Sequence, residues 1–345
     1  MATASLELPP RGEPLLVLDA VSKSYGDVRA VENVSLAIPR GAIYGFLGPN
    51  GAGKTTAIRA IMGIIVPDSG TIELAGGRID ARVRDRIGYL PEERGLYRKM
   101  KCVDQLAYLA ELKGVPRREA LRRAASWLDR MGLEQWKQRK VDALSKGMQQ
   151  KIQFAATFIF EPDLVILDEV FSGLDPLNIE LLRTMILEQR DRGTTILFST
   201  HMLAEAEKIC DAICLIEGGR KILDGTMDEV RRDFPLQSVR VAFAGGDEPP
   251  AGLPGVVSRQ FEEGSWLLTL EPGTDTQRLL ELLAAQGALA LFAANRPSLS
   301  EIFLTAVRRQ RGDEAAAKIA AQVQADGMNT AAIPGTDARA REAAR

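Results

Sequence analysis

The octapeptide GPNGAGKT, Gly48 to Thr55, constrains the fold more than any other stretch of this sequence. It has the spacing G-x-x-x-x-G-K-[ST], and it directly follows the apolar run AIYGFL. Glycines allow the backbone to curl until successive N–H groups face one anion, and the following helix directs its positive N-terminus to the same point. The pattern therefore predicts a strand, a phosphate-binding loop and a helix, in that order.

The residue types in this loop predict how a nucleoside triphosphate is held. Lys54 is expected to reach the β- and γ-phosphates, and the Thr55 hydroxyl is expected to bind Mg²⁺. The predicted nucleotide-binding residues of the loop are Gly48, Pro49, Asn50, Gly51, Ala52, Gly53, Lys54, Thr55 and Thr56.

A second motif, LVILDE, supplies two carboxylates at the end of an apolar run. A buried strand here would deliver Asp168 to the carboxyl edge of a sheet, where ligands bind in folds of this kind. Asp168 is expected to hold Mg²⁺, directly or through water, and Glu169 to orient or deprotonate the attacking water. The alternative, a solvated acidic pair that merely ends a strand, is weak beside a phosphate loop.

The pattern of apolar and polar residues changes along the chain. Short apolar runs alternate with helical patterns up to about residue 235, which predicts a parallel sheet covered by helices. A block at about 100–160 is helical throughout and indicates a helical subdomain. We expect a flexible leader at 1–13, the main domain at 14–235, a small α+β domain at 236–310, and a helical or disordered tail at 311–345. In the small domain, the runs SVRVAFAG and SWLLTLEPG alternate as strands do.

Composition limits the partners. The 345 residues carry a net charge of −2, so no basic field favours nucleic acid, and no nucleic-acid partner is expected. No apolar run approaches the ~20 residues that span a bilayer, so we expect a cytosolic protein unless another component holds it at a membrane. Cys102, Cys210 and Cys214 fit a reducing compartment. The last two, four apart on a predicted helix, could present two metal ligands, but burial as small apolar residues is the preferred interpretation.

Five further stretches agree in order and spacing with one family. They are Tyr25 in SKSYGD, Glu92 in GYLPEERGLY, the segment LSKGMQQK from Leu144, the segment SGLDP from Ser172, and His201, the only histidine of the chain. With the two motifs above, they resemble the ATP-binding subunits of ABC transporters over about residues 15–235. GYLPEERGLY is similar to stretches in the exporter branch that includes sodium and drug efflux ATPases, which often carries a small appended C-terminal domain.

The resemblance implies a fold and a set of roles. The fold is an α/β P-loop NTPase cassette with a mostly parallel core sheet, an antiparallel β subdomain and a helical subdomain. ATP and Mg²⁺ are the implied cofactors, Tyr25 stacks on adenine, and two chains sandwich two ATPs head to tail. The signature that meets the partner's ATP is Leu144, Ser145, Lys146, Gly147, Met148 and Gln149, and the D-loop is Ser172, Gly173, Leu174 and Asp175.

Three positions depart from the family pattern without loss of an expected contact. Lys146 replaces a glycine, Met148 replaces a common glutamine, and Val170 follows Glu169 where proline is frequent. Ser145 and Gly147, which would make the phosphate contacts, are both present, and their position at the start of a helix suits an anion.

Glu92 is a more consequential departure, because most members have glutamine at this Q-loop position. A carboxylate can bind Mg²⁺, which prefers hard oxygen donors. It also adds negative charge near Asp168, Glu169 and the phosphates. We therefore expect assembly of the site to depend more on Mg²⁺ than it would with glutamine.

His201 follows the apolar run TTILFST, which we expect to form a strand beside LVILDE. A lone histidine on a β-rich segment is ordinarily a core residue. The strand, however, would carry this one to the nucleotide edge. There its imidazole is expected to bind the γ-phosphate and hold Glu169 and the water in line.

The function expected from these features is an energy-coupling ATPase that dimerises, with itself or with a similar subunit, and powers a separate integral membrane permease, most simply an exporter. It would lie peripherally on the cytoplasmic face of the inner or plasma membrane. The alternative is a soluble ABC ATPase with a nucleic-acid or ribosomal partner, but the chain has one cassette and no long coiled-coil insertion. A phosphate-loop kinase would leave the signature and His201 unexplained. For the C-terminal domain, dimer support or regulation is favoured over a carbohydrate-binding role, since ~75 residues is small for a sugar-binding sandwich.

Overall fold

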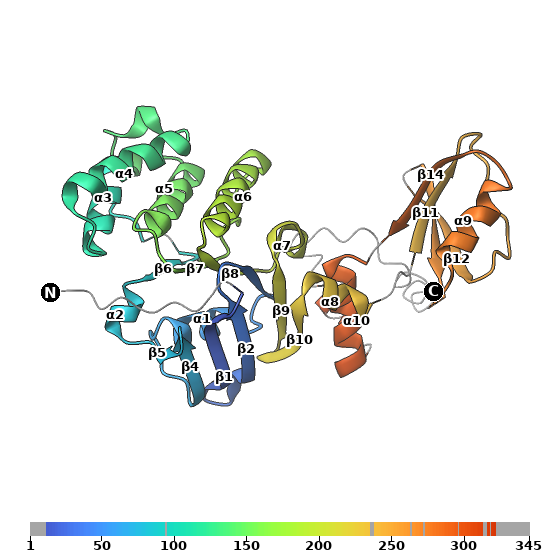
Figure 1. Cartoon of the computed structure of the whole chain (residues 1–345), viewed down its shortest axis with the longest axis horizontal. Coiled ribbons are helices and arrows are strands. Elements are labelled where there is room, and N and C mark those ends of the chain that lie inside the picture. The colour runs from blue at the N-terminus through green and yellow to red at the C-terminus, as the bar shows by residue number, and fades with distance from the viewer. Residues whose placement is uncertain are drawn as a thin grey trace, which may run out of the picture. The chain divides into compact units, whose positions relative to one another are not determined.

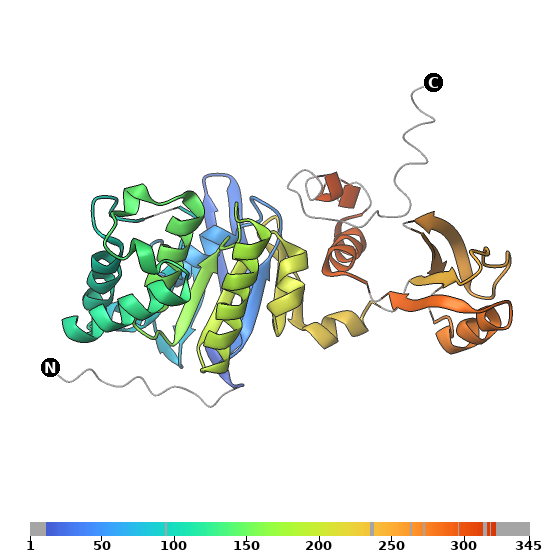
Figure 2. The ribbon, with the colours of Figure 1, turned by 90° about the horizontal axis from the view of Figure 1, so that it is seen from above.

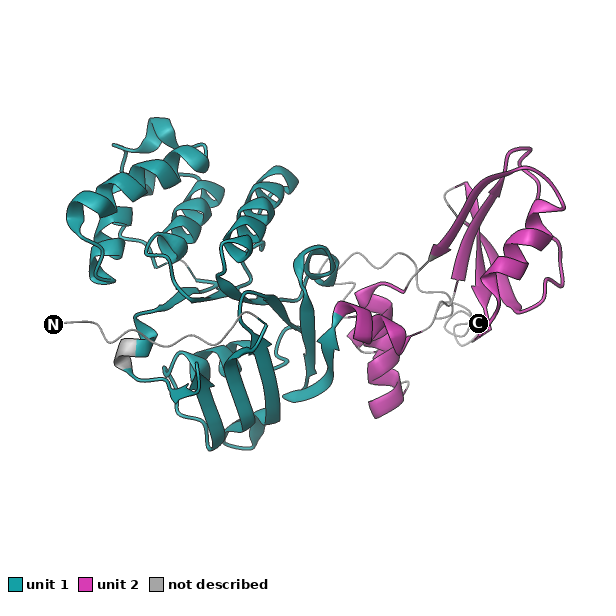
Figure 3. Ribbon diagram, in the orientation of Figure 1, with its two compact units in different colours: residues 1–226 teal, residues 227–345 magenta. Residues whose placement is uncertain are grey.

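The computed structural model describes residues 12–93, 95–234, 238–262, 264–271, 273–295, 297–312, 316–317 and 319–321. The expected leader and tail therefore lie largely outside the described residues. The chain divides into two compact units, Met1–Thr226 and Met227–Arg345, which are described separately (Figure 3).

A six-stranded sheet forms the centre of the first unit, with the order β10-β9-β3-β8-β7-β6. The strands are β3 Ile43–Leu47, β6 Ile87–Leu90, β7 Leu164–Asp168, β8 Thr195–Thr200, β9 Ala212–Glu217 and β10 Arg220–Thr226. All neighbouring pairs are parallel except β9 and β10. Strands β3, β7 and β8 are buried along their whole length. The continuous apolar runs in the sequence are explained by this two-sided burial.

A second, antiparallel sheet has the order β2-β1-β4-β5, with β1 Pro14–Tyr25, β2 Val28–Pro39, β4 Ser69–Leu74 and β5 Gly77–Arg78. One apolar cluster joins both sheets of this unit to helix α1 Lys54–Ile61; it includes Leu16, Ile38, Phe46, Ile58 and Ile166. The mostly parallel sheet and the antiparallel sheet confirm the expected α/β cassette fold.

The helices α3 Cys102–Leu112, α4 Arg117–Arg130 and α5 Lys146–Phe158 lie together on one side of this unit (Figures 1 and 2). Short 3₁₀ turns, η1 Glu134–Trp136 and η2 Val141–Ala143, connect α4 to α5. The rings of Trp127, Phe154 and Phe158 pack together at centroid distances of 4.7–6.3 Å. Helices α2 Ala81–Arg84, α6 Pro176–Asp191 and α7 Leu203–Ile209 complete the unit.

The second unit contains a four-stranded antiparallel sheet with the order β12-β13-β11-β14. Its elements are α8 Met227–Arg232, β11 Ser238–Phe243, β12 Val256–Glu262, β13 Ser265–Leu270, α9 Thr276–Ala284, β14 Leu289–Asn295 and α10 Leu299–Arg311. Leu279 and Leu283 of α9 pack on Val239, Val241 and Leu268. Strands β12 and β14 were not expected from the sequence. In β14, LALFAAN, an alanine-rich run alternates too weakly to stand out.

Within the described residues, no helix is both long and apolar enough to cross a membrane.

Candidate functional site

The phosphate loop lies between β3 and α1, as the sequence predicts. Gly53 has a φ of +104°, and a Cβ there would overlap the Ala30 carbonyl oxygen. A Cβ at Gly48 would overlap the Ile216 carbonyl oxygen in the same way. Only glycine can therefore follow this path so close to β2 and β9.

The loop borders a cavity of about 530 Å³. Most of the predicted nucleotide-binding residues line this cavity, and so do Glu92, Glu169 and the first residues of β2, which the sequence did not single out. The lining comprises Val28, Arg29, Ala30, Asn50, Gly51, Ala52, Gly53, Lys54, Thr55, Thr56, Glu92, Glu169 and Gly218. The cavity is therefore the candidate nucleotide site, hereafter the P-loop cavity.

Lys54 is folded into the P-loop cavity and is only 6% exposed. Its Nζ donates to the carbonyls of Gly48 and Pro49 at 2.7 and 3.2 Å, and lies 3.7 Å from Oε1 of Glu169. Burial lowers the pKa of Lys54, an effect that Glu169 and Asp168 partly oppose. Phosphate oxygens bound beside Nζ would oppose it further, so the ammonium is poised for an anion.

Glu169 is held from both sides by the end of β8. The Thr200 hydroxyl donates to Oε2 at 3.1 Å, and the backbone N–H of His201 donates to Oε1 at 3.0 Å. The imidazole Nδ1 of His201 lies 2.8 Å from Oε2. Glu169 itself has a left-handed φ of +52°, a conformation that costs a residue with a side chain about 1 kcal/mol or more. The surrounding contacts thus impose a position that the free backbone would avoid.

Asp168 ends β7 and is 1% exposed. The Ser199 hydroxyl donates to its Oδ1 at 2.9 Å. Burial raises the pKa of Asp168, the Ser199 hydrogen bond counteracts this, and the charges of Glu169 and Glu92 add to the rise. Strand β8 pairs in parallel with β7, which confirms the expected adjacency of TTILFST and LVILDE.

Ser199 and Thr200 were missed by the sequence reasoning, although they hold both carboxylates. The signal that could have found them is their position. They are the last two residues of the strand, directly before His201.

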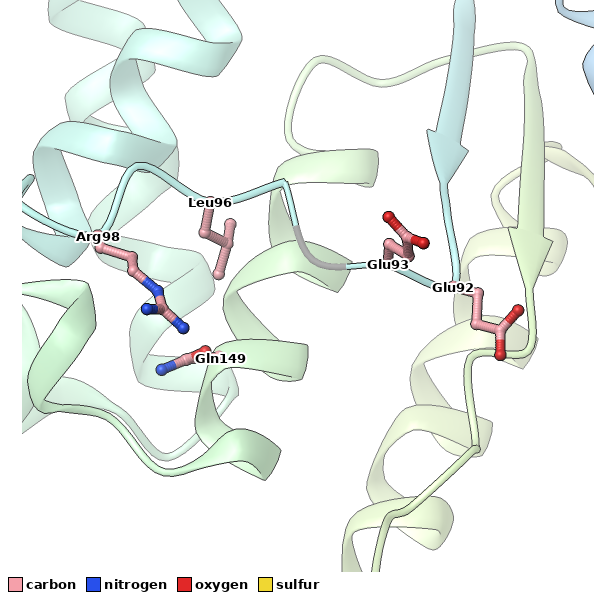
Figure 4. Close-up of a pocket in the computed structure, with 5 residues that line it drawn as sticks. All are labelled: Glu92, Glu93, Leu96, Arg98 and Gln149. Atoms are coloured by element: carbon pink, nitrogen blue, oxygen red, sulfur yellow. The ribbon is translucent and has the colours of Figure 1, made fainter.

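Glu92 follows β6 and lines the P-loop cavity, and it also borders a second cavity of about 440 Å³. Glu93, Leu96, Arg98 and Gln149 complete the lining of the second cavity, with Arg98 and Gln149 extending toward each other (Figure 4). Glu92 therefore lies where the P-loop cavity meets the helical part of the unit.

The signature residues surround the start of α5. Ser145 caps the helix by accepting the N–H of Met148 at 3.3 Å, and Gln149 Nε2 donates to the Leu144 carbonyl at 3.0 Å. Ser145 and Lys146 are exposed. None of the predicted signature residues is among the described residues that line the P-loop cavity of the same chain.

The D-loop residues join β7 to α6. Ser172 and Gly173 are exposed, and Gly173 has a φ of +68°. Asp175 caps α6 by accepting the N–H of Asn178 at 3.0 Å. Leu174 lies beside the signature, since a Cβ on Gly147 would be 3.8 Å from its side chain.

Tyr25 ends β1 with 49% of its surface exposed. Tyr25 does not line the P-loop cavity, but Val28, which pairs with it between β1 and β2, does line it. The Lys23 Nζ lies 5.8 Å from the centre of its ring.

The expectation that Cys210 and Cys214 share a helix is wrong. Cys210 follows α7 and Cys214 belongs to β9, because the chain turns into the core sheet between them. Both thiols are buried, as expected for small apolar residues, and burial raises their pKa values.

The oxygen donors at the P-loop cavity suit Mg²⁺ bound together with phosphate. Thr55 and Glu92 line this cavity, and the buried Asp168, which is not among the lining residues, directly precedes Glu169 of the lining. These residues offer a hydroxyl and carboxylates, the ligand types that Mg²⁺ prefers. Across the described part of the chain, no three His, Cys, Asp or Glu side chains are grouped to hold a metal alone. Mg²⁺ normally takes one or two carboxylates and completes its shell with substrate phosphates and water, so this donor set fits it.

Comparison with known proteins agrees with this geometry. The family model "ABC transporter" matches residues 31–172. The uncharacterized ABC transporter ATP-binding protein YhaQ of Bacillus subtilis is 38% identical over 293 residues, which cover 85% of this chain and 98% of YhaQ. The chain belongs to the ABC transporter ATP-binding proteins.

Other similarities extend the comparison. The model "ATP-binding protein DrrA1-3-like, C-terminal domain" matches residues 225–307. The Nod factor export ATP-binding protein I of Ralstonia nicotianae is 33% identical over 312 residues, 87% of this chain and 96% of that protein. A solved ATP-binding subunit of an ABC transporter superposes with a TM-score of 0.60 at 37% identity, covering 64% of this chain and 93% of the other.

Family membership makes this chain an ATP-binding, ATP-hydrolysing subunit of a transporter rather than a soluble ATPase with a nucleic-acid or ribosomal partner. Such subunits dimerise and work with a membrane permease.

Proposed function

We propose that two copies of this chain, or one copy and a similar subunit, close head to tail around two Mg·ATP and thereby drive export through a separate permease. The P-loop cavity of each chain would hold one ATP, and the signature of the other chain would close over it. The single observation that carries this proposal is the Glu169 carboxylate, which Thr200 and His201 fix beside Lys54 in the P-loop cavity.

In the proposed reaction, Thr55, Asp168 and Glu92 would hold Mg²⁺, which would withdraw charge from the phosphate oxygens. Glu169 accepts the proton of the attacking water through a carboxylate oxygen. Lys54 would release the loop carbonyls to which it donates and donate to β- and γ-phosphate oxygens instead. Its long side chain needs only a small movement to do so.

His201 would contribute a contact to the γ-phosphate. Its Nδ1 lies 2.8 Å from Oε2 of Glu169, so the ring stands beside the carboxylate that would take the proton. Donation from Nε2 to a γ-phosphate oxygen would then hold Glu169 and the attacking water in line.

The exposure of the signature supports the head-to-tail arrangement. Ser145 and Lys146 are exposed at a helix N-terminus suited to an anion, and neither is among the residues that line the P-loop cavity of their own chain. The D-loop, from Ser172 to Asp175, is exposed beside them and would lie at the same dimer contact. Tyr25, half exposed near the cavity, would stack on the adenine ring.

Export is proposed from the relatives, among which is a Nod factor export ATP-binding protein. Docking of a permease segment would use the cavity between Glu92 and Gln149 (Figure 4), and would hold the protein at the cytoplasmic face of the membrane. We assign the ATP-binding role to residues 14–235 and a dimer-supporting or regulatory role to residues 236–310.

The deciding experiment uses Glu169→Gln. We expect ATP hydrolysis to fall by roughly 100-fold or more while ATP binding persists, because the amide accepts hydrogen bonds but cannot take a proton. The trapped ATP state should then run as a dimer in size-exclusion chromatography. A variant that stays monomeric with Mg·ATP would contradict the sandwich. Co-purification with the permease, followed by substrate-stimulated ATPase, tests the transport role.

A further inference from the structure

A buried glutamine of the signature helix holds the backbone on both sides of Glu92. Gln153 lies in α5 and is 6% exposed. Its Nε2 donates to the carbonyl of Pro91 at 3.1 Å and to that of Glu93 at 3.2 Å. The segment that leaves Glu92 passes beside this helix, which also carries Gln149 (Figure 4). The Gln153 amide is therefore hydrogen-bonded to the backbone immediately before and after Glu92, the residue that replaces the family's glutamine.

The chemistry of this amide determines its orientation. Backbone carbonyls only accept, so the end of the Gln153 side chain that faces them must be the NH₂ group. The other end, Oε1, is buried without a hydrogen-bond partner among the described residues. An unsatisfied buried oxygen destabilises the folded state. An apolar side chain of the same length would avoid this cost, so the benefit of the amide lies in its two donated hydrogen bonds.

The same helix is also fixed to the strand that delivers Glu92. Gly88 of β6 faces α5 so closely that a Cβ there would be 2.6 Å from the Thr157 carbonyl oxygen. Thr157 in turn donates its hydroxyl to the Gln153 carbonyl at 2.9 Å. Strand β6 and the Glu92 segment are therefore both in direct contact with α5.

A second glutamine, one turn earlier on α5, reaches the other acidic segment. Gln150 is buried, and its Nε2 donates at 3.3 Å to the carbonyl of Val170, the residue after Glu169. A spacing of three residues places Gln150 and Gln153 on one face of the helix. The helix that begins at Ser145 is thus hydrogen-bonded to the backbone beside both Glu92 and Glu169.

We propose that Gln153 is a positioning residue that holds the Glu92 carboxylate at the P-loop cavity, where it helps to retain Mg²⁺. This inference rests on the proposed role of Glu92. It also predicts that α5 links the signature at its N-terminus to the Q-loop of the same chain. Movement of the signature against a partner's nucleotide would then move Glu92 with it.

The test replaces Gln153 with leucine in the full-length protein. Without the two donated hydrogen bonds, the Glu92 segment is free to shift, and we expect the Mg²⁺ concentration for half-maximal ATPase to rise about tenfold. ATP affinity without Mg²⁺ should stay within about twofold, because no loop contact is lost. Gln153→Met, unbranched and of similar length, serves if the leucine variant does not fold.

Gln105→Leu is the matched control. Gln105 is also a buried helical glutamine, but neither of its side-chain polar atoms has a hydrogen-bond partner among the described residues. It should leave the Mg²⁺ dependence unchanged, whatever it does to the melting temperature. An equal rise in both variants would show a general packing effect and overturn the proposal.

A double-mutant cycle with Glu92→Ala separates the two proposals. If Gln153 acts through Glu92, Gln153→Leu should change the Mg²⁺ dependence by less than about twofold once Glu92 is gone. If the effects of the two substitutions on the Mg²⁺ dependence are fully additive, the inference about Gln153 is overturned while the proposed role of Glu92 stands. The same holds if Gln153→Leu has a normal Mg²⁺ dependence and Glu92→Ala an impaired one. A normal Glu92→Ala would overturn the proposed role of Glu92, and the inference with it.

Discussion

Two helix N-termini of this chain, those of α1 and α5, have different surroundings. The start of α1 is enclosed, with Lys54 buried in the P-loop cavity and Glu169 3.7 Å from its Nζ. The start of α5 is open, with Ser145 and Lys146 exposed and only the Ser145 hydroxyl occupied in capping the helix. Each N-terminus is the positive end of its own helix dipole, but the residues around the two ends differ.

In the proposed head-to-tail dimer, the α1 end would supply one half of each site already assembled, and the exposed α5 end would supply the other half to the partner. At α1, side chains from three neighbouring strand ends converge before any ligand arrives. At α5, none of the described signature residues lines the P-loop cavity of the same chain. A second chain is the simplest way to bring the two halves together.

The largest expected effects come from one substitution in the α1 half and one in the α5 half. Lys54→Ala should weaken ATP binding by roughly 100-fold or more, since it leaves Glu169 and the phosphates without their buried cation. Ser145→Arg should leave ATP binding by the single chain intact but abolish ATP-driven dimerisation. Each variant alone should therefore lack ATPase activity.

Mixing the two inactive variants is the sharper measurement. In a mixed head-to-tail dimer, one site joins an intact P-loop cavity to an intact signature, so about a quarter of the parent ATPase activity should return. Two copies of the same variant cannot form such a site. If mixing restores nothing, the signature of one chain does not complete the cavity of the other.

A smaller effect separates binding from hydrolysis within the α1 half. His201→Ala removes the contact beside Glu169 but leaves Lys54 and the loop untouched. We expect ATP binding within about twofold of the parent and hydrolysis reduced by roughly 100-fold, the usual loss when one preorganised donor is removed. Single-turnover hydrolysis and nucleotide titration measure the two quantities, and an ATPase rate near the parent's would refute the role. As the only histidine, His201 can also be followed by NMR without an assignment problem.

The smallest effect concerns stability. Burial raises the pKa of Asp168, so its charged form is penalised in the folded state at neutral pH. Asp168→Asn can still accept from Ser199, and we expect it to raise the melting temperature without nucleotide by about 2 °C. The folded state binds this proton more tightly than the unfolded state does, so the penalty fades as the pH falls through the raised pKa. The gain should therefore shrink toward acidic pH. The exposed cap gives the contrast, since Ser145→Ala should lower the melting temperature.

The sequence predicted the α1 half well, because its constraints are local. The sequence Gly53, Lys54, Thr55 after a buried strand is typical of a loop that binds phosphate. The alternation of buried runs likewise predicted strands β3, β7 and β8. The prediction was poorer where the pattern was weak, as in β14, or where the chain turned unexpectedly, as between Cys210 and Cys214.

By itself, the sequence determined the phosphate loop, the acidic strand end and the place of His201, because each depends on residue types at short spacings. Only the tertiary structure decided what holds these groups. Ser199, Thr200, Gln150 and Gln153 carry no motif, and their hydrogen bonds join segments that lie 20 to 62 residues apart. Contacts over such separations arise from the order of strands in the sheet and from the packing of α5 on β6, which no local pattern encodes.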